Sequence, residues 1–144
     1  MPDFHNPTGL VMSERDRAAY ARLLARHDAV AVVDEAHHLL RLDGDPVADA
    51  KRPFASYSKD AICVGSASKS VWGGMRLGWI RAPHALVDRL TRARVGLDLG
   101  VPVLEQLVLT RLLTGDLDAV VETQRERLRS QRDGLAAALR ERLP

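Results

Sequence analysis

Three short segments of the chain hold side chains that could do chemistry together. They are Asn6-Pro7-Thr8-Gly9, Asp34-Glu35-Ala36-His37, and Ser66-Ala67-Ser68-Lys69, which is followed by Arg76. A lysine amine can bond covalently to a carbonyl carbon, and an arginine fork together with hydroxyl groups can hold a phosphate. Taken singly, each segment also has an ordinary structural explanation, as a turn, a helix cap, a solvated loop or part of an ion pair.

Two apolar runs lead directly into two of these segments. Residues 29–33 and 61–64 are short and continuously apolar, which indicates strands covered on both faces. The first run ends in Asp34 and the second in Gly65-Ser66. Functional groups of open α/β sheets belong at such loop and strand-end positions, so both polar segments are candidates for a functional site.

A third strand is expected over residues 75–80, after a turn at Gly73-Gly74. Upstream, Ser13 is a candidate N-cap for a helix that ends near His27. Leu23 and Leu24 would lie on the buried side of that helix.

Helical patterns fill much of the remaining chain. Helices are expected over residues 83–93, 102–113 and 116–143, whereas residues 40–60 indicate a surface connection. The last helix is long and charged, and its expected apolar stripe is Val120, Val121, Leu128, Leu135 and Leu139. The alternation of strands and helices predicts an α/β architecture with a mostly parallel sheet.

Together, and in this order, the polar segments resemble the fold-type I pyridoxal-phosphate (PLP) enzymes. That family carries Asn-Pro-x-Gly, a strand-end aspartate, Ser-x-Ser-Lys and then Arg-x-Gly. The runs PDFHNPTG, VGSASKSVWGGMRLGWIRAP and LDLGVPVLEQLV are closer still to the aminotransferase-like domain of MocR-type GntR regulators. The resemblance covers nearly the whole chain. It implies part of a three-layer PLP-transferase large domain over residues 1–115, and a long helix over 116–144 that leads toward a small domain.

The resemblance implies that Lys69 holds the cofactor as a Schiff base and later shuttles the proton. Lysine is the only side chain that can do both. The other lysines, Lys51 and Lys59, lie in the polar connection and are expected to be solvated. Asp34 matches the family aspartate that keeps the pyridine nitrogen protonated, while Glu35 is expected to be structural.

The same resemblance assigns the phosphate and the phenolic oxygen of the cofactor. Arg76 and Ser66, with Ser68 more weakly, would bind the phosphate. Asn6 would donate a hydrogen bond to the phenolic oxygen, and the Asn6-Pro7 peptide bond would be cis. Trp72 and Trp79 are assigned to packing.

The sequence departs from the family pattern in two respects. Many relatives have a tyrosine after the strand-end aspartate, where this chain has Ala36 and His37. His37 could donate the hydrogen bond instead, or could simply be packed or exposed. The family's ring-stacking aromatic and phosphate loop would lie before residue 1, and the arginine for the substrate carboxylate after residue 144. We therefore expect a half-built site, with weak cofactor binding and little or no transamination by this chain alone.

Two functions share all of these residues. One is a PLP-dependent aminotransferase that acts on an amino acid or amine. The other is a PLP-binding sensor domain of a MocR/GntR-type transcription regulator, which binds the cofactor without turnover. A winged helix encoded immediately upstream would favour this second function over the first. The substrate or effector is left open, and a homodimer of the full-length protein is expected by analogy alone.

Two further interpretations stand apart from these. The run AVAVVDEAHHL also resembles the Walker B strand of a DEAH-type helicase. However, the chain contains no G-x-x-x-x-G-K-[ST] motif, and a helicase would leave Asn6 and Arg76 unexplained. The chain could also be a non-functional remnant whose exposed sheet edges favour aggregation or dimerisation.

The composition narrows the classes of protein that fit. A chain of 144 residues with 46% hydrophobic and 28% charged residues is typical of one globular domain. The net charge of +2 is spread along helical stretches with few aromatics, so nucleic-acid binding by this chain is not indicated. The single cysteine, Cys63, excludes an internal disulfide. No run is long enough for a membrane span or typical of a signal peptide, so we expect a cytoplasmic protein. We also expect no metal site.

Overall fold

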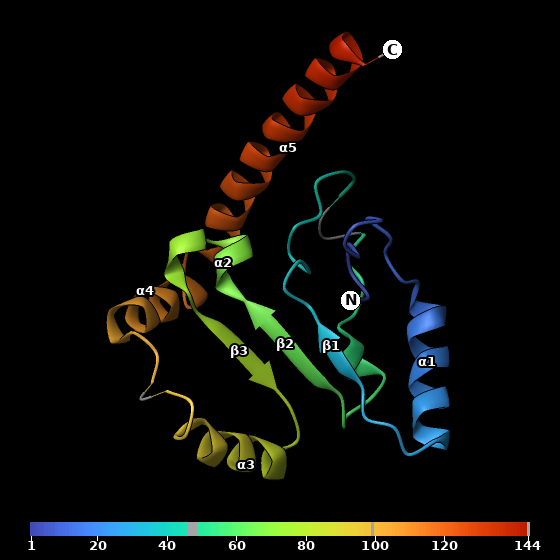
Figure 1. Ribbon diagram of the computed structural model, residues 1–144, viewed down its shortest axis with the longest axis vertical. Helices are drawn as coiled ribbons and strands as arrows, with labels where there is room; N and C mark the ends of the chain where they lie inside the picture. The colour runs from blue at the N-terminus through green and yellow to red at the C-terminus, as the bar shows by residue number, and fades with distance from the viewer. Residues whose placement is uncertain (46–48, 99, 144) are drawn as a thin grey trace.

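The computed structural model describes residues 1–45, 49–98 and 100–143 (Figure 1). Its centre is a three-stranded sheet in the order β1-β2-β3, made of β1 (Val32–Asp34), β2 (Ile62–Ser66) and β3 (Gly78–Arg81). Strands β1 and β2 are parallel, with Asp34 beside Val64. The prediction of an α/β fold is confirmed in these residues, and the paired β1 and β2 end at one edge of the sheet.

The third strand corrects the prediction of a mostly parallel sheet. Strand β3 runs antiparallel to β2, with Ser66 beside Gly78. The chain between them forms the short helix α2 (Ala67–Ser70) and the 3₁₀ turn η2 (Gly73–Met75). A parallel neighbour needs a longer crossover, so this short connection returns the chain in the opposite direction.

The described part of the chain contains five α-helices besides the sheet. Besides α2 they are α1 (Glu14–Arg26), α3 (His84–Arg94), α4 (Val103–Leu113) and α5 (Leu117–Arg142). Figure 1 shows α1 beside β1, α3 and α4 on the side of β3, and α5 projecting away from the α2 end of the sheet. A 3₁₀ turn, η1 (Phe54–Ser56), precedes β2.

Helix α1 begins as the sequence predicts. The Ser13 hydroxyl accepts a hydrogen bond from the Asp16 backbone N–H at 3.1 Å, which caps the first turn. Leu24 packs against the core, as expected, whereas Leu23 is 49% exposed and its predicted burial is wrong.

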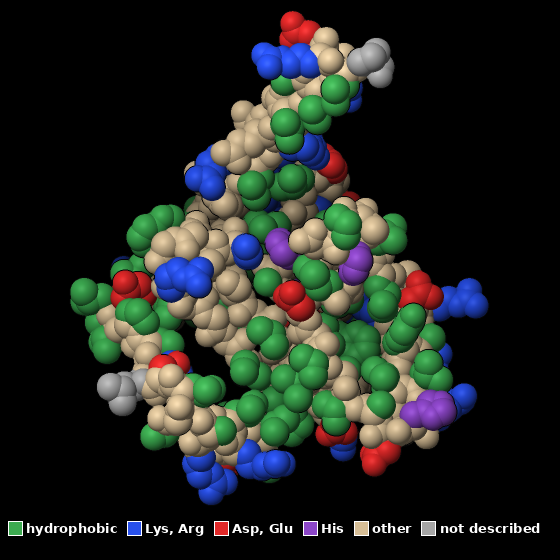
Figure 2. Space-filling model, viewed as in Figure 1, with side chains coloured by type: hydrophobic (Ala, Val, Ile, Leu, Met, Phe, Trp, Pro, Cys, Tyr) green, Lys and Arg blue, Asp and Glu red, His purple; other side chains and the backbone are tan. Residues whose placement is uncertain are grey.

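The sheet is covered on one face only. Val33 and Cys63 are buried against Ala21 of α1 and Phe54 of η1. On the opposite face the side chains of β1, β2 and β3 are exposed: Val32 (71%), Val64 (37%) and Ile80 (49%). The prediction of strands covered on both faces is therefore wrong for the described residues. Figure 2 shows hydrophobic side chains gathered at the surface over the lower part of the molecule.

A second, smaller core lies at the α2 end of the sheet. Ala67, Met75 and Leu77 are buried there, with Leu109 and Leu112 of α4 packed against them. Neither α3 nor α4 has a fully buried residue. Of the apolar stripe predicted for α5, Val121 is buried, whereas Leu135 and Leu139 are 62% and 46% exposed.

A buried arginine fastens the N-terminal loop to helix α1. Arg17 is fully buried and forms an ion pair with Asp3. Its guanidinium also donates to the carbonyl oxygens of Met12 and Arg52, at 3.1 Å in each case. This one side chain therefore holds loop 1–12 and the segment before η1 against α1.

Replacing Arg17 with methionine is expected to destabilise the fold strongly, because the buried Asp3 carboxylate would lose its main partner. Breaking one side of a buried pair costs about 3–5 kcal/mol. The free energy of unfolding, measured by urea titration, should fall by that amount or the variant should fail to fold. Arg22→Met, at an exposed position of the same helix, is the control and should change stability little. Equal urea midpoints for the two variants would contradict this account.

Candidate functional site

The carboxyl ends of β1 and β2 deliver two of the three polar segments to one edge of the sheet (Figure 1). Ser66 ends β2 and caps α2, where its hydroxyl accepts a hydrogen bond from the Ser68 backbone N–H at 3.3 Å. This short helix presents Lys69 to solvent. Ser66 therefore has a structural role in positioning the backbone of the turn that carries Lys69.

A cavity of about 570 Å³ joins α2, the N-terminal loop, the segment after β1 and helix α5. Its volume is in the range of small-molecule sites. The residues that line it are Phe4, Gly9, His37, Leu40, Arg41, Leu42, Asp43, Ser68, Lys69, Gln124, Leu128 and Arg132. The structure thus brings Ser68 and Lys69 together with His37, which lies far from them in the sequence.

His37 is the most informative of these lining residues. Its Nδ1 atom is buried and has no hydrogen-bond partner among the described residues. Buried polar atoms are nearly always paired, so such an atom on a cavity wall requires an explanation.

Arginines of helix α5 hydrogen-bond to the segment after β1, which forms one wall of the cavity. Arg125 donates to the Leu39 carbonyl at 2.9 Å, and Arg129 donates to the Leu42 carbonyl at 2.5 Å. Both arginines also pair with Glu122, and these hydrogen bonds, first from Arg125, keep the pKa of Glu122 below its ordinary value. The segment after β1 is therefore fixed to α5 by its backbone.

Asp34 lies at the end of β1, on the exposed face of the sheet with Val64 and Ile80. One carboxylate oxygen accepts a hydrogen bond from the Ala36 backbone N–H at 2.9 Å. No helix directly follows Asp34, so it is not a helix cap; the bond closes an Asx turn that fixes the side chain at the edge of the sheet. Glu35 is structural, as predicted, because it accepts from the Phe54 backbone N–H at 3.0 Å.

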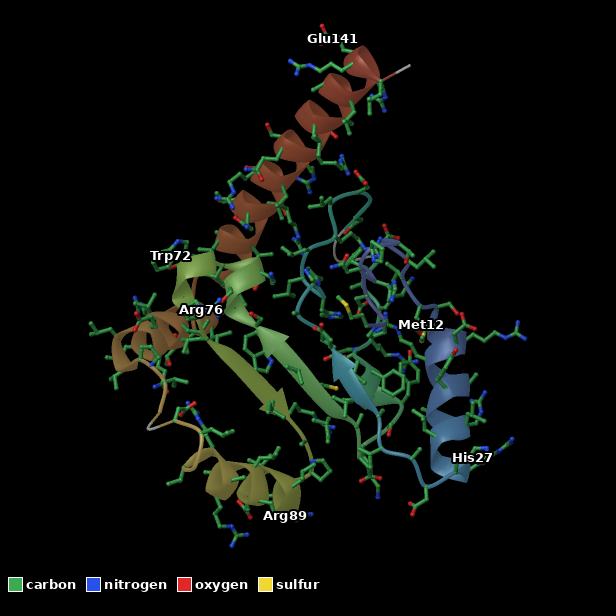
Figure 3. All side chains as sticks on the ribbon, in the orientation of Figure 1. Met12, His27, Trp72, Arg76, Arg89 and Glu141 are labelled. Carbon is green, nitrogen blue, oxygen red and sulfur yellow. The ribbon has the colours of Figure 1, made fainter. Side chains whose placement is uncertain are left out.

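Arg76 follows η2 in the left-handed backbone region, with φ 52° and ψ 28°. The sequence suggests that Gly73 and Gly74 provide the tight turn, yet neither has positive φ. A non-glycine residue costs about 1–2 kcal/mol in this conformation. Such strained residues cluster at functional sites. Figure 3 shows Arg76 beside Trp72, at the α2 end of the sheet.

Asn6 is exposed within a tightly bonded loop. The Asn6-Pro7 peptide bond is cis, which confirms the expectation from the family resemblance. The Gly9 N–H donates to the His5 carbonyl at 2.7 Å, and the Met12 N–H donates to the Pro2 carbonyl at the same distance. Gly9 has φ 69°, so a glycine is favoured where the loop reverses.

The remaining candidates are not all brought into one cavity. Ser66 lines a neighbouring cavity of about 180 Å³ together with Glu35 and Trp79. Asn6, Asp34 and Arg76 line neither cavity. The indole of Trp79 lies over Gly65, where an added Cβ would be 2.2 Å from the ring, in keeping with its assignment to packing.

Sequence reasoning missed several residues of the cavity. Leu128 was expected in an apolar stripe but lines the cavity instead. Gln124, also on α5, donates to the Lys69 carbonyl at 3.5 Å, and Arg41 lies 5.5 Å from the Phe4 ring centroid. Helical spacing could indicate the Leu128 face of α5, but no local pattern tells which element covers it.

Two negative findings hold for the described residues. They contain no group of three or more acidic, histidine or cysteine side chains arranged to hold a metal ion. None of the helices in these residues is both long enough and apolar enough to cross a membrane.

Comparison with known proteins supports one family throughout. The chain matches the family described as aminotransferase class I and II over residues 3–143. It is 29% identical to aromatic-amino-acid aminotransferase 1 of Thermococcus litoralis, a match over the whole chain and 34% of that protein. It is also 30% identical to YdfD, an uncharacterised HTH-type transcriptional regulator of Bacillus subtilis, over 96% of the chain and 28% of the regulator.

Solved structures agree with these relatives. The Pyrococcus horikoshii kynurenine aminotransferase, solved with PMP, superposes with a TM-score of 0.85 at 29% identity, over 99% of this chain and 35% of that one. LysN, the α-aminoadipate aminotransferase of Thermus thermophilus, was solved with N-(5'-phosphopyridoxyl)-L-leucine. It superposes with a TM-score of 0.84 at 25% identity, over the whole chain and 37% of LysN.

The chain spans about a third of the length of these proteins. Its relatives include both aminotransferases and HTH-type regulators, as the sequence motifs suggest. The match includes the run that resembles a Walker B strand, so the helicase interpretation has no remaining support. The chain belongs to the aminotransferase class I and II family.

Proposed function

We propose that this chain supplies the PLP-attaching part of an aminotransferase-type site, with Lys69 as the residue that bonds the cofactor. The observation that carries the proposal is the position of Lys69, exposed on α2 and lining the 570 Å³ cavity with Ser68 and His37. Two solved relatives hold PMP or a phosphopyridoxyl compound. We extend that cofactor class to this chain.

The residues around the cavity fit such a group chemically. The exposed Lys69 amine, Ser68 and the His37 side chain line the same space. When bound, PLP supplies an electron-withdrawing ring that stabilises negative charge on the substrate carbon. Lys69 would bond the cofactor and then move the proton at its Nζ atom. His37 would offer Nδ1 in the place where many relatives have a tyrosine.

The other candidates would bind and orient the cofactor. The Asp34 carboxylate would favour a protonated ring nitrogen, and the Asn6 amide would donate to the phenolic oxygen. Ser66 and Ser68 would donate to the phosphate, and Arg76 would pair with it. In this proposal residues 1–115 belong to the large domain, and 116–144 form the helix toward a small domain. The amino acid or amine substrate, and a homodimer of the whole protein, are part of the same proposal.

A second function is a PLP-binding sensor domain without turnover. It is favoured by the 30% identity to a Bacillus subtilis regulator, which extends over 96% of the chain. Both functions need the same cofactor site. A DNA-binding winged helix in the same polypeptide, together with the absence of amino-acid turnover, would decide for the sensor.

Reconstitution with PLP tests the role of Lys69 directly. The chain is mixed with PLP, reduced with borohydride and digested, and the modified lysine is located by mass spectrometry. We expect the label on Lys69 and its loss in Lys69→Met. Lys51→Met and Lys59→Met are matched controls, because these are the other two lysines of the chain, and both should keep the label. Equal labelling of all three lysines, or none in a folded chain, would overturn the proposal.

Asp34→Asn is expected to weaken PLP binding by about 10- to 100-fold, because a hydrogen bond to a charged group contributes about 1.5–3 kcal/mol. The asparagine oxygen can still accept from the Ala36 N–H, so the turn after β1 should be retained. Asp60→Asn, at an exposed turn, is the control. The measurement is a PLP titration followed by visible absorption, and equal affinities for the two variants would count against the role of Asp34.

A further inference from the structure

Asp3 links two walls of the candidate site through a carboxylate that is almost fully buried. The residue is 3% exposed and receives partners from two different elements. Arg17 of α1 forms an ion pair with one carboxylate oxygen and also donates to the other at 3.3 Å. The Nδ1 atom of His38, in the segment after β1, lies 3.1 Å from the other oxygen. No local sequence pattern relates these residues.

The position of this triad connects it to the site. Asp3 precedes Phe4, which lines the cavity beside Lys69, and it lies in the same loop as Asn6. His38 follows His37, which lines the same cavity and whose Nδ1 is buried without a partner among the described residues. A change in the contact between Asp3 and His38 would therefore move the loop and the segment after β1 relative to each other.

The two partners of Asp3 differ in how they respond to pH. A guanidinium group does not lose its proton in the ordinary pH range, so the ion pair with an arginine does not change with pH. His38 changes charge near neutrality, and its side chain is 25% exposed, which leaves it open to protons from solvent. Other charged groups near His38 are Glu35 on its own segment, and Arg41, Lys51 and Arg125 around a small cavity of about 60 Å³ beside Asp3.

We propose that Asp3 is a positioning residue of the cofactor site, and that His38 makes its hold on loop 1–12 dependent on pH. With His38 protonated, the Asp3 carboxylate is held from both sides, and the loop that carries Phe4 and Asn6 is fixed. With His38 neutral, the imidazole charge is lost and only a hydrogen bond from the Nδ1–H tautomer remains, so the contact weakens and the loop loosens. The link to cofactor binding rests on the proposed function, whereas the link to loop stability does not.

The direction of the pH effect follows from the shifts of the two groups. The hydrogen bond to Asp3 raises the pKa of His38 above its ordinary value of 6.5, although burial opposes it. This stabilisation is complete below pH 6.5 and is lost as the pH rises through the raised value. Burial raises the pKa of Asp3, but hydrogen bonds from His38 and Arg17 outweigh it and keep the pKa below 3.8. The stabilisation by the ion pair between Asp3 and protonated His38 is therefore fully present between pH 3.8 and 6.5.

Hydrogen exchange of the loop amides tests, without any cofactor, whether the contact between Asp3 and His38 fixes loop 1–12. The N–H groups of Gly9 and Met12 donate to carbonyls within loop 1–12 and report its opening. We expect their protection, corrected for intrinsic exchange rates, to fall severalfold between pH 5.5 and pH 8. The midpoint should match the His38 titration followed by NMR. His38→Gln should give low protection at both pH values.

The matched control is His5→Gln, because His5 is the loop's own histidine and its Nδ1 lies 3.0 Å from the Thr8 hydroxyl. This variant should keep the pH dependence. Protection that is independent of pH in the unsubstituted chain, or dependent on pH to the same extent in His38→Gln, would overturn the proposal.

A second experiment tests whether the contact between Asp3 and His38 affects cofactor binding. PLP affinity is compared between the unsubstituted chain and His38→Gln at each pH, so that ionisation of the cofactor itself cancels. We expect the unsubstituted chain to bind PLP more tightly than His38→Gln at pH 5.5. At pH 8 the ratio of the two affinities should approach one. A ratio of one at both pH values would remove the positioning role of Asp3. Failure of PLP to bind, with a pH-dependent loop, would overturn the proposed function and leave the pH-dependent hold intact.

Discussion

The parallel pairing of β1 with β2 is the constraint on which the candidate site depends. Parallel strands end at the same edge of a sheet, so Asp34 and Ser66 are delivered to one place although 32 positions of sequence numbering separate them. The short connection into the antiparallel β3 keeps Lys69 and Arg76 at that edge, because Ser66 and Gly78 are directly paired. The buried contact between Arg17 and Asp3 then adds the loop that carries Asn6.

Local signals were sufficient to predict most of the elements. Ser13 caps the first helix as expected, and the remaining long helices begin and end within a few residues of their predicted bounds. The strand ends at Asp34 and Ser66 follow from apolar runs that stop at polar residues. These features depend on neighbours in the sequence, and that is why a single chain contains enough information for them.

Features that depend on distant partners were not predictable in this way. A continuously apolar strand indicates burial on both faces, but the exposure of Val32 depends on which elements pack above it. The hydrogen bonds from Arg17 to Asp3 and from α5 to the segment after β1 join residues with no periodic relation. Family resemblance, rather than spacing, supplied the roles proposed for Lys69 and Asp34. The structure adds the cavity that places Lys69 beside His37 and helix α5.

The central claim is that the three polar segments form parts of one cofactor site. An NMR titration of the isotopically labelled chain with PLP tests this most directly, because each backbone amide reports binding near it. The account predicts that amides of residues 5–9, 34–38 and 66–76 shift together along one saturable curve. Shifts confined to the surroundings of Lys51 and Lys59, or separate curves for the three segments, would contradict it.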